Sequence, residues 1–198
     1  MAITRRVGTA QSKTRALILD CAERLLLKKG YASLSYRTLG TEAGVTGALV
    51  QYYFPTFDDL FVALVRDRSE RTLKTLTAGL DTDHPLRAIW DYANNKHAAA
   101  LTAELMAAAN HRKRLRAEIA QAGEQARAAA LEAVSRTTEN CPWPAAPIPL
   151  EVLVFLITST PRMIVMERSM GIKTSLDETI AYFERFLDEV EPLDGTQG

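Results

Sequence analysis

Apolar residues recur at intervals of three and four positions along most of this 198-residue chain, a spacing typical of amphipathic α-helices. No segment shows the sustained alternation of apolar and polar residues, with β-branched enrichment, that is typical of a half-buried strand. Because 47% of the residues are apolar, a helical chain of this length can bury a substantial core. The sequence therefore predicts an all-α fold.

The first helix is predicted over Thr14–Lys29, and two much shorter helices follow it. Ser35 can cap a helix over Tyr36–Ala43, because a serine oxygen accepts from free N–H groups of a first turn. Gly44 ends that helix, and Thr46 can cap the next one, over Gly47–Tyr53. Two short helices joined by a glycine turn and braced by a preceding helix form the helix-turn-helix arrangement, whose second helix can enter a major groove.

Six more helices are predicted further along the chain. They span residues 57–79, 86–94, 96–110, 113–137, 150–170 and 176–190. Prolines make residues 140–149 a stiff connector, and the tail from Pro192 is expected to fray. We predict a DNA-binding domain over residues 1–56, with a basic N-terminal arm, joined by a long helix to a second helical domain over residues 57–198.

The charges are divided unevenly between these two parts. The chain has 24 basic and 24 acidic residues and no net charge, which by itself argues against a nucleic-acid partner. However, residues 1–56 hold eight basic and three acidic residues, a net charge of +5, so the remainder carries −5. A duplex attracts the first part and repels the second, which indicates one part that faces double-stranded DNA.

Several other classes of protein are not expected. The two cysteines, Cys21 and Cys141, have no companions at metal-ligand spacing, so we predict neither a metal site nor a cofactor. Paired carboxylates, a nucleophile with a base at interpretable spacing and a phosphate loop are all missing, so we expect no enzyme activity. Without a secretory signal or a membrane-spanning run, a cytoplasmic protein with no membrane partner is expected.

Four segments in the first third of the chain resemble the DNA-binding domain of the TetR family of bacterial one-component regulators. They are Ile18–Leu25, Gly30-Tyr31, Glu42–Val45 and Val45–Leu60, in the family's order and spacing. The resemblance covers residues 14–64, whereas the rest resembles the family only as a helical region of suitable length. It implies a homodimer that binds DNA and a small effector, with residues 57–198 as the effector-binding and dimerisation domain.

The resemblance also implies which residues meet DNA. Gly47, Ala48, Gln51 and Tyr52 would face base edges or the groove wall, and Tyr53 and Thr56 would lie near phosphates; the alternative for the tyrosines is a place in the core. A glutamine can pair with adenine in bidentate fashion, and an alanine methyl can touch thymine. The full predicted DNA-binding set is Lys13, Arg15, Ser35, Arg37, Thr46, Gly47, Ala48, Gln51, Tyr52, Tyr53 and Thr56.

Basic residues outside the recognition helix have two interpretations. Arg37 is either a phosphate contact or a solvated helix charge. The arm with Arg5, Arg6 and Lys13 is either a nonspecific phosphate binder or a solubilising tail. The later basic cluster at residues 112–116 precedes acidic residues, so we interpret it as a solvated helix start and not as a second nucleic-acid patch.

Three residues depart from the pattern of the TetR family. Gln51 replaces the usual tyrosine, and Phe57 stands where a phosphate-binding lysine is frequent, which indicates one charge contact fewer. Gly40 replaces the commoner alanine and is expected to weaken its short helix by up to about 1 kcal/mol.

The C-terminal part supplies two further predicted sites. For the effector, large and adaptable apolar side chains combine with the resemblance to imply a pocket lined by Trp90, Leu101, Leu105, Met106, Phe155, Met163 and Met166. For the dimer, an apolar helix followed by an amphipathic one can form a four-helix interface with a symmetry mate. Its predicted residues are Leu153, Ile157, Ile180, Phe183, Phe186 and Leu187.

Together these features predict a dimeric, sequence-specific transcriptional regulator, namely a repressor released from a pseudo-palindromic operator by a small hydrophobic effector. One alternative is an all-helical small-molecule carrier or enzyme, which would need a polar constellation in the C-terminal part. Another is a DNA-binding regulator whose C-terminal part binds a protein partner instead of a ligand.

Overall fold

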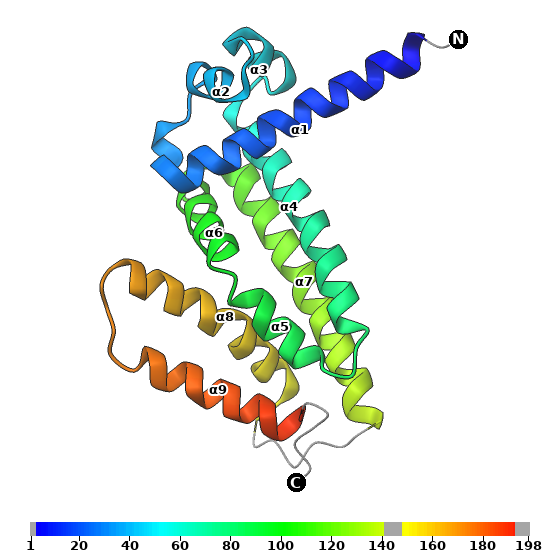
Figure 1. Cartoon of the computed structure of the whole chain (residues 1–198), viewed down its shortest axis with the longest axis vertical. Coiled ribbons are helices and arrows are strands. Elements are labelled where there is room, and N and C mark those ends of the chain that lie inside the picture. Colours follow the sequence, from blue (N-terminus) through cyan, green and yellow to red (C-terminus); the bar gives the residue numbers. More distant parts are fainter. Residues whose placement is uncertain (1–2, 141–147, 193–198) are drawn as a thin grey trace. The chain divides into compact units, whose positions relative to one another are not determined.

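The computed structural model describes residues 3–140 and 148–192, and this part of the chain contains nine α-helices, one short 3-10 helix and no strand, as the all-α prediction requires. The helices are labelled in Figure 1. They are α1 (Ile3–Lys29), η1 (Tyr31–Ser33), α2 (Tyr36–Ala43), α3 (Gly47–Tyr53), α4 (Phe57–Leu80), α5 (Pro85–Ala93), α6 (Lys96–Ala109), α7 (Lys113–Asn140), α8 (Leu150–Ser169) and α9 (Leu176–Val190). The predicted connector and the frayed tail lie largely outside the described residues.

The helix boundaries follow the sequence pattern closely, with one correction. The helices α2, α3 and α9 begin and end at the predicted residues, whereas α1 begins at Ile3 and not at Thr14. The prediction relied on the denser run of apolar residues that begins at Leu17, but the preceding residues contain no proline, so the helical backbone can continue back to Ile3. The basic arm therefore has a helical backbone.

The chain divides into two compact units. One consists of Met1–Arg68 and Leu101–Ala120, and the other of Ser69–Ala100 and Gln121–Gly198. This division follows packing, whereas the predicted division at residue 57 follows function and stays a prediction.

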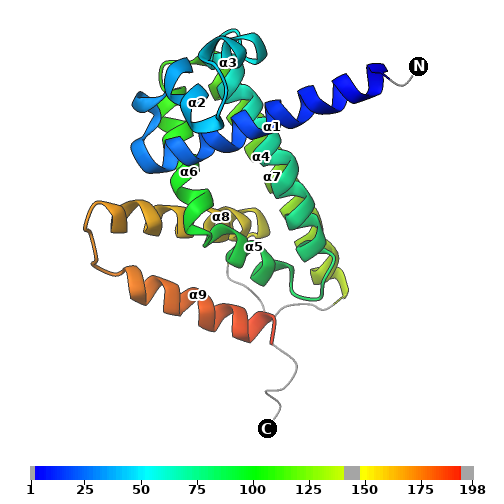
Figure 2. The ribbon, with the colours of Figure 1, turned by 45° about the horizontal axis from the view of Figure 1, so that its top comes forward.

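The core of the first unit is formed by the buried face of α1 against the short helices and the start of α4. Ile18 and Cys21 of α1, Leu39 of α2, Val50 of α3 and Leu60 of α4 are each fully buried. Figure 2 shows α2 and α3 beside α1. The short helices are held by this shared core, because helices of seven and eight residues are not stable alone.

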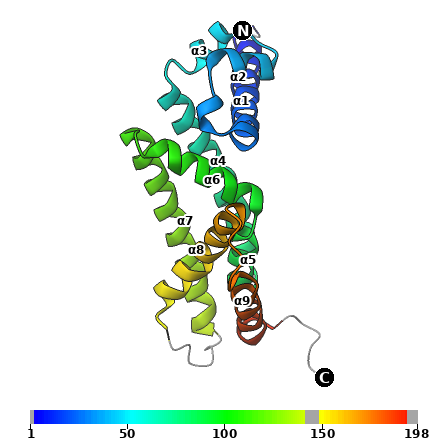
Figure 3. The same cartoon turned by 90° about the vertical axis from the view of Figure 1, so that its left-hand side faces the viewer.

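The second unit is built around α5, α8 and α9, with parts of α4 and α7. The rings of Trp90 and Phe183 stack with centroids 5.0 Å apart, and α5 packs beside α8 (Figure 3). All six residues predicted for the dimer interface belong to this core or pack against it: Leu153, Ile157, Phe183 and Leu187 are buried, and Ile180 and Phe186 are partly buried. Their apolar side chains therefore hold the chain's own fold together.

In the second unit, a buried carboxylate connects the end of α9 to the start of α5. Glu191, just after α9, is 2% exposed, and its two oxygens accept from the backbone N–H groups of Leu86 and Arg87, each at 2.8 Å. His84 stands at the N-cap of α5 but makes no capping hydrogen bond. Glu191 therefore supplies from a distance the acceptor that the first turn of α5 needs.

Within the described residues, the helices are too short or too polar to cross a membrane. The same residues contain no group of three or more histidine, cysteine or acidic side chains that could hold a metal ion.

Candidate nucleic-acid interface

The start of α2 is fixed by a reciprocal pair of hydrogen bonds. The Ser35 hydroxyl accepts from the backbone N–H of Thr38 at 3.0 Å, and the Ser35 N–H donates to the Thr38 hydroxyl at 2.9 Å. This capping box satisfies two backbone donors at once and sets the direction of the helix. Ser35, which the sequence places in the DNA-binding set, is thus engaged in shaping the helix.

The turn between α2 and α3 depends on two glycines. Gly44 adopts φ 65° and ψ 30°, the left-handed conformation that ends α2. At Gly40, an added Cβ would lie 2.8 Å from the carbonyl oxygen of Val45 and 2.9 Å from the nitrogen of Gly47. The sequence analysis expected Gly40 only to weaken its helix. The structure shows why a glycine is needed at this position: only a residue without Cβ lets α3 begin this close to α2.

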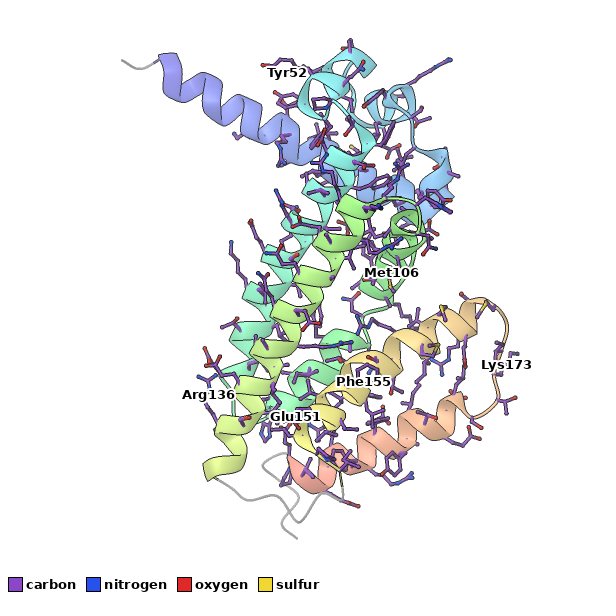
Figure 4. All side chains as sticks on the ribbon, turned by 180° about the vertical axis from the view of Figure 1, so that it is seen from behind. Tyr52, Met106, Arg136, Glu151, Phe155 and Lys173 are labelled. Carbon is purple, nitrogen blue, oxygen red and sulfur yellow. The ribbon has the colours of Figure 1, made fainter. Side chains whose placement is uncertain are left out.

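The recognition helix α3 is anchored on one side and open on the other. Thr46 caps it by accepting from the N–H of Leu49 at 3.2 Å, and Val50 is fully buried beneath it. Ala48, Gln51 and Tyr52 are exposed, and Tyr52 keeps 68% of its surface (Figure 4). Since positions three and four apart share a helix face, these three side chains form one solvent-facing surface.

Gly47 and Tyr53 lie at the edges of this surface. Both are half-buried, and a Cβ at Gly47 would come within 3.1 Å of the carbonyl oxygen of Tyr36. Gly47 can therefore offer a partner little more than its backbone.

The end of α3 is held by a tyrosine that the sequence analysis missed. The Tyr36 hydroxyl donates to the carbonyl oxygens of Phe54 (3.1 Å) and Pro55 (2.9 Å), and its ring stacks on Phe57 at 4.8 Å. Phe54 is buried, and the Arg15 guanidinium lies 5.2 Å above its ring centre. Because burial raises the pKa of Tyr36, the hydroxyl keeps its proton and remains a donor. No local pattern in the sequence indicates this contact, because Tyr36 and Phe54 are 18 residues apart.

The start of α4 is capped by Thr56 together with Asp59. The Thr56 hydroxyl donates to Asp59 Oδ2 at 2.7 Å and accepts from the Asp59 N–H at 3.1 Å. The bond from Thr56, followed by one from Arg114 at 3.0 Å, holds the pKa of Asp59 below its usual range. The Thr56 hydroxyl already donates its proton to the Asp59 carboxylate. The predicted contact of Thr56 with a phosphate would therefore compete with this hydrogen bond.

The basic cluster after α6 neutralises acidic residues of the first unit. Arg112 pairs with Asp58 at 2.9 Å and lies 5.3 Å over the ring of Phe61, while Arg114 pairs with Asp59. These pairs are only partly shielded from water, so each contributes modestly to stability. Their larger effect is electrostatic, because they cancel two negative charges at the start of α4, directly after the recognition helix.

The remaining cations of the predicted set lie at the surface. Lys13, Arg15 and Arg37 are exposed, whereas Arg24 is paired with Glu42 at 3.4 Å. The side chains of Arg5 and Arg6 lie outside the described residues. The described surface thus combines a neutral, aromatic face on α3 with cations from α1 and α2.

The predicted effector-pocket residues are distributed over both units. Leu101, Leu105 and Met106 belong to the first unit, and the other four to the second. Trp90, Leu101 and Leu105 are buried, whereas the side chains of Met106, Phe155, Met163 and Met166 are exposed. The exposed members therefore present apolar surface to solvent.

Part of the sequence matches a family of regulatory proteins. Residues 18–64 match the family of bacterial regulatory proteins described as tetR family. An uncharacterised HTH-type transcriptional regulator, from the dhlA 5′ region of Xanthobacter autotrophicus, is 36% identical over 88 residues. That match spans 41% of this chain and 44% of the relative, so it covers less than half of either protein.

Solved structures share the fold along nearly the whole chain. A TetR transcription regulator from Haloarcula marismortui superposes with a TM-score of 0.72 at 19% identity, covering 89% of this chain and 96% of that one. A regulator from Saccharomonospora viridis, solved in complex with choline, gives 0.76 at 16% identity with the same coverage. The fatty acid degradation regulator FadR from Bacillus halodurans gives 0.69 at 16% identity, covering 93% and 96%.

Proposed function

Because the chain belongs to the TetR family of bacterial regulatory proteins, we propose that it is a homodimeric repressor that binds a pseudo-palindromic operator and is released by a small effector. The observation that carries this proposal is the exposed face of Ala48, Gln51 and Tyr52 on a recognition helix anchored by buried Val50. Such a face offers a methyl group, an amide and an aromatic hydroxyl, which can contact base edges in a major groove.

The proposed dimer uses the outward face of α8. Val152, Phe155, Met163, Met166 and Met170 are between 42% and 61% exposed, and their spacings of three, eight, three and four residues place them on one side of this helix or just after it. A row of exposed apolar side chains on one helix is a typical protein-protein contact surface. In a two-fold dimer, the two recognition helices would enter successive major grooves roughly 34–36 Å apart.

The proposed effector acts through the difference in its affinity for DNA-bound and free protein. A coupling free energy of about 1–3 kcal/mol would change operator affinity roughly 5- to 150-fold, which is enough to switch transcription. The regulator from Saccharomonospora viridis was solved in complex with choline. Because the two folds are similar, we propose that this chain also binds a small molecule, whose chemical identity the similarity does not specify.

Selection of bound duplexes from random DNA at several salt concentrations tests the proposal. A consensus with two inverted half-sites, about ten base pairs apart, is the expected result for a two-fold dimer. Enrichment of no sequence, together with binding that depends only on salt, would contradict a sequence-specific regulator.

Gln51→Ala and Lys13→Ala are expected to separate base readout from phosphate contact. Loss of the exposed Gln51 amide should relax preference at one position of each half-site, by about 1–3 kcal/mol. Loss of the exposed Lys13 charge should instead weaken all duplexes alike and reduce the salt dependence by about one phosphate contact. Fluorescence anisotropy on the selected duplex and its single-base variants measures both. A uniform loss of affinity for Gln51→Ala would remove Gln51 from the base-reading set.

A further inference from the structure

The recognition helix α3 lies in a stretch of the chain that carries no charge. Residues 43–57 contain no lysine, arginine, aspartate or glutamate, and the stretch is flanked by Glu42 and Asp58. Guanine is most commonly read in a major groove by a lysine or arginine that contacts its O6 and N7 atoms. No side chain of α3 can read guanine in this way.

Exposed cations of the first unit lie on the neighbouring helices. Lys13 and Arg15 belong to α1, and Arg37 belongs to α2. Positive charges attract the phosphates of any duplex and carry no information on its sequence. In a helix-turn-helix the second helix enters the major groove, so preference for one sequence over another depends here on the neutral side chains of α3.

Buried Val50 fixes which side chains of α3 point outward. Successive residues of an α-helix are turned by about 100°, so Ala48 and Tyr52, each two residues from Val50, lie nearly opposite it. Leu49 and Gln51, its immediate neighbours, lie on the two edges of the open face. All four side chains are exposed, Leu49 by 36% and Tyr52 by 68% (Figure 4). Leu49, which is not in the DNA-binding set predicted from the sequence, is therefore part of the same surface.

The open face of α3 offers two kinds of group that discriminate between bases. Ala48 and Leu49 end in methyl groups, and among the four bases only thymine presents a methyl group, at C5, in the major groove. The Gln51 amide can donate to N7 of adenine and accept from its N6 at the same time. Tyr52 both donates and accepts through one hydroxyl, so it favours no single base. The discriminating groups therefore all select A·T pairs.

We propose that the operator half-sites carry A·T pairs beneath α3, with Ala48 and Leu49 against thymine methyl groups and Gln51 on adenine. This inference rests on the proposed DNA-binding function and names the chemistry of the duplex that the site takes. Contact between methyl groups removes apolar surface of both partners from water, which stabilises the complex. Guanine in the place of adenine would present two acceptors to Gln51, so the amide oxygen would lose its donor.

Base analogues in the selected duplex test this inference one atom at a time, with the full-length protein and fluorescence anisotropy. Deoxyuridine in place of thymidine removes the C5 methyl group and keeps base pairing, and 7-deazaadenine in place of adenine removes the N7 acceptor. Deoxyuridine should weaken binding about fourfold at the thymines beneath Ala48 and Leu49, as for one buried methyl group. 7-Deazaadenine should weaken it about fivefold at the adenine bound by Gln51. The same analogues outside the half-sites are the control on DNA and should have no effect.

Protein variants assign each effect to a side chain. Leu49→Ala should lose most of the response to deoxyuridine at one thymine, and Gln51→Ala should lose the response to 7-deazaadenine. Leu17→Ala is the matched control: Leu17 is also an exposed leucine of the first unit (42%), but it lies on α1, and the variant should retain both responses. Each response is the ratio of two affinities of one protein, so partial unfolding of a variant lowers both affinities alike and leaves the ratio unchanged.

Three results would overturn the inference: Leu49 and Gln51 variants that change the preference at G·C pairs, wild-type binding that is insensitive to both analogues, or variants that respond to the analogues as the wild type does. A selection that enriches no sequence would contradict the proposed function as well. An enriched palindrome that α3 reads at G·C pairs would keep the sequence-specific regulator and contradict only the A·T half-site.

Discussion

Glu191→Ala is expected to lower the free energy of unfolding by roughly 2–4 kcal/mol, because two backbone donors at the start of α5 lose their acceptor in a largely buried place. Leu86 is fully buried, so water cannot replace the carboxylate at its N–H without opening the core. Urea denaturation measures the change. Glu191→Gln retains one acceptor oxygen and the side-chain volume and should cost about half as much. An alanine variant as stable as the wild type would show that α5 needs no acceptor from α9.

The difference in stability between the wild type and Glu191→Gln is expected to depend on pH, with a defined sign. Burial raises the pKa of Glu191 above its ordinary value of 4.5, although the N–H groups of Arg87 and Leu86 and the charges of His84 and Arg87 oppose the shift. A folded state that binds the proton more tightly than the unfolded state gains stability as pH falls through the folded pKa towards 4.5. The difference in stability between wild type and Glu191→Gln should therefore shift in favour of the wild type between neutral pH and pH 4.5.

Gly40→Ala is expected to lower the free energy of unfolding by about 1–3 kcal/mol and to weaken operator binding, although alanine is the better helix former by about 1 kcal/mol. The new Cβ would lie 2.8 Å from the carbonyl oxygen of Val45, so α2 and α3 must separate. Backbone atoms cannot rotate aside as a side chain would. Denaturation and fluorescence anisotropy on the selected duplex measure the two effects.

Gly123→Ala is the matched control for this change. Gly123 lies inside α7, and an added Cβ there would meet nothing within 4 Å. The same substitution should therefore stabilise the protein by up to about 1 kcal/mol and leave operator affinity unchanged. If Gly40→Ala were as stabilising as Gly123→Ala, the close approach of α2 and α3 would not be a constraint on this fold.

Local signals in the sequence were sufficient for most of the helices. Ser35, Gly44 and Thr46 act on backbone groups within four residues of themselves, so the ends of α2 and the start of α3 follow from residue type and spacing. The beginning of α1 was missed because the prediction relied on the denser run of apolar residues that begins at Leu17. The contacts of Tyr36 and Glu191 were also missed, because they join residues 18 and about 105 positions apart.

The success of the site predictions also depended on whether a signal was local or involved residues far apart in the sequence. The outward side chains of α3 could be deduced because buried Val50 fixes the rotation of a short helix. The inward and outward faces of α8 could not, because both faces of this helix carry large apolar residues. Leu153 and Val152 are adjacent and equally suited to an interface by type, yet the first is 2% exposed and the second 42%.

The sequence by itself determined the all-α class, the order of the helices and the helix-turn-helix, since these depend on periodicity and on caps that act over one turn. The tertiary structure alone decided which apolar faces fill the core, why Gly40 must lack a Cβ, and that the charges of Arg112 and Arg114 are matched by Asp58 and Asp59. The physical reason is range: helix formation is governed by neighbours in sequence, whereas packing and charge pairing depend on residues that only the folded chain brings together.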